Sequence, residues 1–160
     1  MNRDNKGRFT SNSNNIFKLL EESIEKAIAI NKQIRNTHKV MYFGKSYSNK
    51  NSFAKEFQTV HINPGRRTGK TQYIINNAKN GDVIYTPLLS MAEEIRSGLN
   101  LLNKNIDIVL INHNMKNTLG YIPNNIWVDN YSILNDYVDK NKIYNCLNPH
   151  NPYQTFIFLG

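Results

Sequence analysis

The residues with the clearest chemical potential form the sequence Pro-Gly-Arg-Arg-Thr-Gly-Lys-Thr at positions 64–71. Small residues in such a turn let backbone N–H groups converge on phosphate oxygens, so the pattern predicts a phosphate-binding loop. Lys70 would reach the β- and γ-phosphates of a nucleotide, and the Thr71 hydroxyl would bind Mg²⁺. Pro64 departs from the pattern, because glycine usually stands there and Gly65 comes one residue later. The alternative is a basic surface turn.

The segments on either side of the loop suit this prediction. The hydrophobic stretch 57–62 precedes the loop, and a helical pattern over 70–79 follows it and ends at Asn80-Gly81. A helix that begins directly after the loop points its N-terminus at the phosphate charge. We therefore expect ATP and Mg²⁺ as ligands. The expected contacts to the nucleotide come from the loop and the first turn of the helix: Gly65, Thr68, Gly69, Lys70, Thr71 and Gln72.

Asp129 is the second candidate for the site. It follows the apolar residues Ile126-Trp127-Val128, which is the pattern of a buried strand whose end reaches water. A carboxylate in that position can hold Mg²⁺, commonly through a water molecule. The alternative is an aspartate that caps a helix starting near Ser132. Asn130 comes next and is also a catalytic candidate, because an amide can orient an attacking water molecule. An amide cannot accept the proton of that water, so hydrolysis would be slow.

Strand and helix patterns alternate along most of the chain, which predicts an α/β fold with a mostly parallel, five-stranded sheet flanked by helices. An N-terminal helical extension is expected at 14–35, after a flexible basic arm at 1–13, and the nucleotide-binding core would span 57–160 of a single domain, 14–160. The remaining strands are expected at 82–86, 106–111, 126–129 and 156–159, with a short additional one at 40–43. Further helices are expected at 88–102 and 132–140.

Composition and charge narrow the function classes. The hydrophobic content of 39% is sufficient for one core, and Cys146 is the one cysteine, so neither an internal disulfide nor a cysteine-based zinc site can form. The sequence has no apolar run of membrane-spanning length and no secretory pattern at its start, so we expect no membrane partner and a cytoplasmic location. Residues 1–56 hold 11 Lys/Arg and 5 Asp/Glu, which is +6 of the net charge of +8. This excess would attract DNA or another polyanion, or only keep the chain soluble.

The phosphate loop, the strand ending at Pro87 and the strand ending at Asp129 resemble the additional-strand P-loop ATPases. These include superfamily 1 and 2 helicases and the ATPase domain of bacteriophage large terminases. The resemblance covers about residues 40–160 and implies that strand 156–159 lies between strands 57–62 and 126–129. Two departures from the family are Asn130, where glutamate is usual, and Gly160, where a polar sensor is usual.

The resemblance also assigns roles to individual side chains. An arginine in the terminase loop acts in cis on the γ-phosphate, and Arg66 or Arg67 would do the same here. No arginine follows Arg96 that could replace them. Adenine is often held from the segment upstream of the loop, where the aromatic candidates are Tyr42, Phe43 and Tyr47. His61 and His113 are interpreted as structural.

Three functions are compatible with these features. The first is a Mg-dependent ATPase, weak if Asn130 limits the chemistry, that is linked to DNA or a DNA-processing assembly. The terminase resemblance implies that a phage encodes the protein, in which case it would act in the cytoplasm of the host. The second is a nucleotide-binding protein without turnover that serves regulation or assembly. The third is a small nucleoside or metabolite kinase, which the lack of arginine in 97–160 disfavours.

Overall fold

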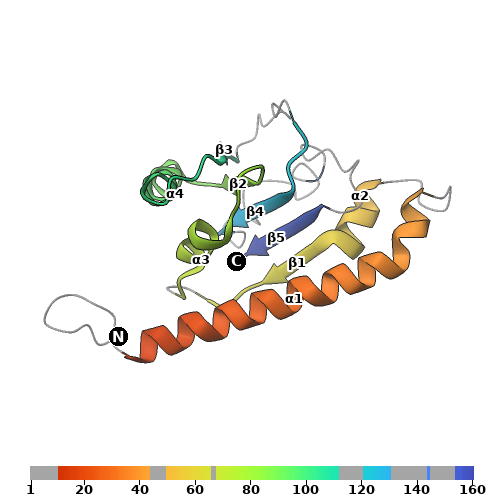
Figure 1. Ribbon diagram of the computed structural model, residues 1–160, viewed down its shortest axis with the longest axis horizontal. Coiled ribbons are helices and arrows are strands. Elements are labelled where there is room, and N and C mark those ends of the chain that lie inside the picture. Colours follow the sequence, from red (N-terminus) through yellow and green to blue (C-terminus); the bar gives the residue numbers. More distant parts are fainter. Residues whose placement is uncertain (1–10, 44–49, 66–67, 112–120, 131–143, 145–153) are drawn as a thin grey trace, which may run out of the picture.

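Five parallel strands form one sheet with helices packed against it (Figure 1). The computed structural model describes residues 11–43, 50–65, 68–111, 121–130, 144 and 154–160. The strands are β1 (Thr59–Ile62), β2 (Val83–Thr86), β3 (Asp107–Leu110), β4 (Asn125–Asp129) and β5 (Thr155–Leu159). The helices are α1 (Ser11–Phe43), α2 (Lys50–Phe53), the π-helix η1 (Ala54–Gln58), α3 (Lys70–Asn77) and α4 (Leu89–Leu101). The α/β class and the five-stranded parallel sheet are thus confirmed.

The spatial order of the strands is β1-β5-β4-β2-β3, so the last strand of the chain lies between β1 and β4. This is the position that we expected for strand 156–159. Every neighbouring pair is parallel. All five strands therefore end at the same edge of the sheet, and the segments that follow them can meet there.

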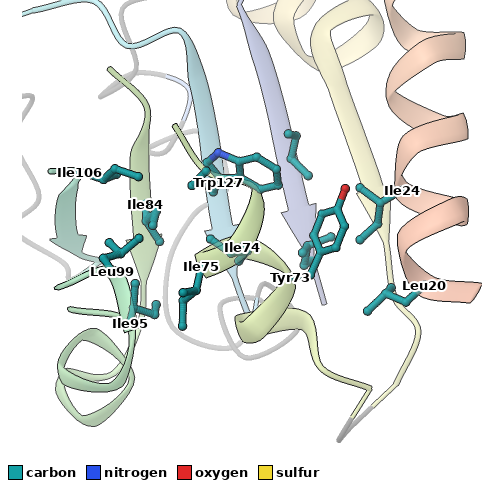
Figure 2. Packing of buried hydrophobic residues seen from close by; sticks show 13 residues of the cluster. Leu20, Ile24, Tyr73, Ile74, Ile75, Ile84, Ile95, Leu99, Ile106 and Trp127 are labelled. Carbon is teal, nitrogen blue, oxygen red and sulfur yellow. The ribbon is translucent and has the colours of Figure 1, made fainter. Parts of the chain in front are cut away.

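Alternating side chains divide the sheet between two hydrophobic clusters. In β4, Trp127 joins the cluster formed with α3 and α4, whereas Ile126 and Val128 face the opposite side. Figure 2 shows the first cluster, in which Tyr73 of α3 extends toward Leu20 and Ile24 of α1. The three inner strands β2, β4 and β5 are buried on both faces, as expected of parallel strands, whereas the edge strands β1 and β3 are partly exposed.

Helix α1 runs along the outer edge of β1 (Figure 1). Its Asn31 side chain donates to the backbone oxygen of Thr59 at 3.3 Å. Further along, Arg35 donates to the oxygen of Gln154 at 2.7 Å and to the Thr155 hydroxyl at 3.0 Å. The helix thus covers a strand edge that would otherwise present free backbone groups. None of the helices in the described part of the chain combines the length and hydropathy needed to cross a membrane.

Several expected boundaries were wrong. Residues 40–43, expected as a strand, form the end of α1, and residues 11–13 of the expected arm form its beginning. Phe57 and Gln58 belong to η1, so β1 starts at Thr59. Within η1, the Gln58 side chain donates to the backbone oxygen of Gln154 at 3.0 Å. The expected helix 132–140 lies outside the described residues.

Candidate functional site

The candidate site lies where β1, β4 and β5 end and α3 begins. The N–H of Tyr73 donates to the oxygen of Gly69 at 2.8 Å and is the first donor of the helical series, so the N–H groups of residues 70–72 have no acceptor within α3. Such N–H groups, together with the helix dipole, attract anions. The loop before α3 and the ends of the strands therefore converge on a position suited to negative charge.

Lys70 is the cation of this position and is buried, with 8% of its surface exposed. Its Nζ donates to the backbone oxygen of Gly65 at 2.7 Å and to the backbone oxygen of Gly160. Gly65 has φ +89°, a conformation that favours glycine. Two backbone carbonyl oxygens thus accept from the Lys70 ammonium group, which would otherwise be able to donate to phosphate oxygens.

Gly69 is required by two independent features. It precedes α3 with φ +85°, and a Cβ placed on it would lie 2.8 Å from Cδ2 of Phe17 on α1. The N-terminal helix therefore contacts the phosphate-loop region directly. Phe17 is a residue that the sequence patterns did not connect with the site.

Gly69→Ala is expected to destabilise the empty protein more than Gly65→Ala does. Both residues have positive φ, which costs about 1 kcal/mol or more for alanine. A Cβ on Gly65 would meet nothing within 4 Å, whereas one on Gly69 would meet the Phe17 ring. We expect losses in the free energy of unfolding of about 1 kcal/mol for Gly65→Ala and about 3 kcal/mol for Gly69→Ala, measured by urea denaturation. Equal losses would show that the Phe17 contact adds no strain.

Thr71 and Asp129, the two residues that the sequence analysis proposed as Mg²⁺ ligands, are in direct contact. The Thr71 hydroxyl donates to Oδ2 of Asp129 at 2.9 Å, and Asp129 is fully buried. Burial raises the pKa of the Asp129 carboxyl, while the hydrogen bond from Thr71, the nearby backbone N–H of Asn130 and the charge of Lys70 oppose this rise. Its second oxygen, Oδ1, has no hydrogen-bond partner among the described residues. A buried carboxylate oxygen without a partner is costly in the empty protein.

Asn130 is turned away from the regular strand conformation. Its φ is +53°, and its side-chain amide donates to Sδ of Met91 on α4 at 3.4 Å. This contact holds the amide nitrogen against α4. Although Asn130 follows Asp129 directly in the sequence, its side-chain amide N–H is directed to the start of α4.

The other residues singled out in the sequence do not all lie at the candidate site. The Thr68 hydroxyl donates to the Gly65 oxygen at 3.2 Å within the loop. Gln72 is exposed and donates to Asn76 Oδ1 at 2.9 Å on the outer face of α3. His61 stacks on Phe158, with ring centroids 4.9 Å apart, as a structural residue would. Four further candidates lie outside the described residues: Arg66, Arg67, Tyr47 and His113. Tyr42 and Phe43 belong to α1, but their side chains also lie outside the described part.

The side chains at this edge of the sheet include oxygen atoms that could act as ligands of Mg²⁺. Within the described residues, no group of three or more His, Cys, Asp or Glu side chains comes together that could hold a metal ion. Mg²⁺ needs only one or two protein oxygens, because water and substrate phosphates complete its shell. The Thr71 hydroxyl and the unpaired oxygen of Asp129 are oxygens of this kind.

Comparisons of the chain with protein-family models, with curated proteins and with solved structures find no match in any of the three. The function therefore has to be inferred from the groups that the fold brings together at this edge of the sheet.

Proposed function

We propose that the protein binds ATP with Mg²⁺ through the loop 64–71 and Asp129, and that it is an ATPase of the P-loop type. The observation that carries this proposal is the hydrogen bond between Thr71 and Asp129 beside the buried ammonium group of Lys70. Two residues 58 positions apart in sequence thereby place a hydroxyl and a carboxylate next to a cation and a helix N-terminus. These four features together bind the Mg-nucleotide in P-loop NTPases.

Each group has a defined part in binding. The Lys70 ammonium would exchange the oxygens of Gly65 and Gly160 for phosphate oxygens, and the N–H groups at the start of α3 would donate to the same phosphates. Thr71 and Asp129 would hold Mg²⁺, which when bound neutralises phosphate charge. Arg66 or Arg67 remains our proposal for the cis-acting arginine. The basic N-terminal third of the chain supports DNA, or an assembly that processes DNA, as the partner.

A nucleotide-binding role without turnover is the second candidate. Asn130 follows Asp129 where a water-activating carboxylate would be expected, and its amide nitrogen is engaged by Met91. An assay of ATP hydrolysis with and without DNA separates the two. Turnover in either condition supports an ATPase, and Mg-ATP binding without turnover in both supports the second candidate.

Asp129→Asn tests the site without disrupting the Thr71 contact, because the amide oxygen can still accept that hydrogen bond. Since burial raises the pKa of Asp129 above its ordinary value of 3.8, the charged carboxylate destabilises the empty fold at neutral pH. The variant is therefore expected to unfold about 2–4 °C higher without ligand, corresponding to about 1 kcal/mol. It should lose the Mg-dependent part of ATP binding.

The pH dependence provides an independent readout of the same variant. A raised folded-state pKa means that the folded protein binds the additional proton, so this contribution to stability falls as pH rises from the ordinary carboxyl value through the raised one. The stability gain of Asp129→Asn should therefore grow across that window and then level off. Asp107→Asn, at an exposed carboxylate on β3, is the control and should leave the Mg-dependent part of ATP binding unchanged. Unaltered Mg-ATP binding by Asp129→Asn would remove Asp129 from the site.

A further inference from the structure

Thr86, the last residue of β2, carries a buried hydroxyl that makes no hydrogen bond within the described part of the chain. Its side chain has no exposed surface, and its Oγ1 has no hydrogen-bond partner among the described residues. Its backbone oxygen, in contrast, is bonded to the N–H of Ile111 at 2.9 Å. An unsatisfied hydroxyl costs folding free energy that valine, of nearly the same shape, would avoid.

The register of the sheet places Thr86 beside Asp129. Tyr85 of β2 is paired with Val128 of β4, and Thr86 and Asp129 are the next residues of these parallel strands. Adjacent strands lie about 4.8 Å apart, and neighbours in register point to the same face. Asp129 points toward α3, where it accepts from Thr71, and Ile84 on β2 packs in the same cluster as α3. The Thr86 side chain therefore shares the α3 side of the sheet with Asp129.

Two buried oxygen atoms to which no described residue donates or bonds thus occur on neighbouring strands at the edge of the candidate site: Oγ1 of Thr86 and Oδ1 of Asp129. A hydroxyl can donate and accept, so it can bind a water molecule that also donates to a carboxylate. Water around Mg²⁺ is commonly held in this way by groups that do not touch the metal.

We propose that Thr86 is a positioning residue which, together with Asp129, holds a water molecule of the bound Mg-nucleotide. This inference rests on the proposed function and adds to it a residue from a third strand. It explains why the fold keeps a hydroxyl that destabilises the empty protein. Thr86 is argued to act through water and not by direct contact with the nucleotide.

The test compares Thr86→Val with Thr86→Ser in the full chain. Valine removes the hydroxyl and keeps the shape, so the melting temperature of the empty protein should rise by about 2–4 °C. The dissociation constant for ATP with Mg²⁺ should increase about tenfold, the equivalent of one hydrogen bond, whereas that for ATP with EDTA should stay unchanged. Serine keeps the hydroxyl and should bind Mg-ATP as the wild type does. Thr86→Ala replaces valine in the same titrations if the valine variant does not fold.

The possible outcomes are separable. If the wild type binds Mg-ATP and the valine variant binds it equally well, the role of Thr86 is overturned while the proposed function stands. Equal weakening with Mg²⁺ and with EDTA would make Thr86 a structural residue, and a lower melting temperature would show that its hydroxyl already has a partner. If the wild type itself fails to bind ATP, the proposed function fails and this inference with it.

Discussion

Lys70→Met is expected to weaken the binding of Mg-ATP at least about a hundredfold. The Lys70 ammonium is buried at the centre of the loop and donates to the oxygens of Gly65 and Gly160, where phosphate oxygens would bind. A hydrogen bond that involves a charged group contributes about 1.5–3 kcal/mol, so the loss of two such bonds corresponds to a factor of 100 or more. Methionine keeps an unbranched apolar stem in the same space. The measurement is a titration of each protein with ATP and Mg²⁺ by calorimetry.

Lys104→Met is the matched control, because Lys104 makes the same kind of contacts at the other end of α3. Its Nζ donates to the oxygens of Ile75 at 2.8 Å and Asn76 at 2.6 Å. Both variants should lose similar stability, since each removes a lysine that caps backbone oxygens. Only Lys70→Met should lose nucleotide binding. If both variants bind Mg-ATP as the wild type does, the loop 64–71 is a basic turn and not a phosphate site.

Asp82→Ala is expected to cause the largest loss of stability, about 4 kcal/mol. The Asp82 carboxylate is buried at the edge of the sheet opposite the site and accepts four hydrogen bonds. Its donors are the Lys79 N–H at 3.0 Å, the Trp127 Nε1–H at 2.9 Å, and the backbone and side-chain N–H groups of Asn125 at 3.1 and 3.0 Å. Alanine would leave these donors without an acceptor, and several of them cannot reach water without opening the sheet.

The control for this prediction is Asp107→Ala, since Asp107 is paired with Val83 at the start of the neighbouring strand but is exposed. Its replacement should cost less than about 1 kcal/mol. Urea denaturation of both variants gives the comparison. A loss from Asp82→Ala no greater than that from Asp107→Ala would contradict the role of Asp82 as the acceptor that joins β2 to β4. The Mg-ATP affinity of the folded Asp82 variant should remain that of the wild type.

Much of the sheet was predictable, because buried parallel strands are marked by short runs of branched and aromatic residues between helical patterns. Thr71 and Asp129 were both candidates from the sequence, but the hydrogen bond between them was not predicted; it arises because a strand end and the start of the helix after the loop meet at one edge of a parallel sheet. The position of β5 between β1 and β4 followed from the family resemblance and not from the residues of β5 themselves.

Other features depend on tertiary contacts that local patterns do not encode. Residues 40–43 read equally well as helix or strand, because a run of four apolar residues has no decisive period, and here they extend α1. The start of β1 is shifted by η1, in which the Gln58 side chain bonds to the Gln154 oxygen. Thr86 could have been noticed as a hydroxyl residue ending an apolar strand, but only the register with β4 places it beside Asp129. The approach of Phe17 to Gly69 spans 52 residues of sequence and has no local signal.

A crystal structure of the protein with Mg²⁺ and a non-hydrolysable ATP analogue tests the central claim most directly. The account predicts phosphate oxygens within hydrogen-bonding distance of Lys70 Nζ and of the N–H groups at the start of α3, with Mg²⁺ beside Thr71 and Asp129. Lys70 would then have released the oxygens of Gly65 and Gly160, which it contacts in the structure described above. A nucleotide bound elsewhere, or a loop in which Lys70 keeps both carbonyl contacts at saturating analogue, would contradict it.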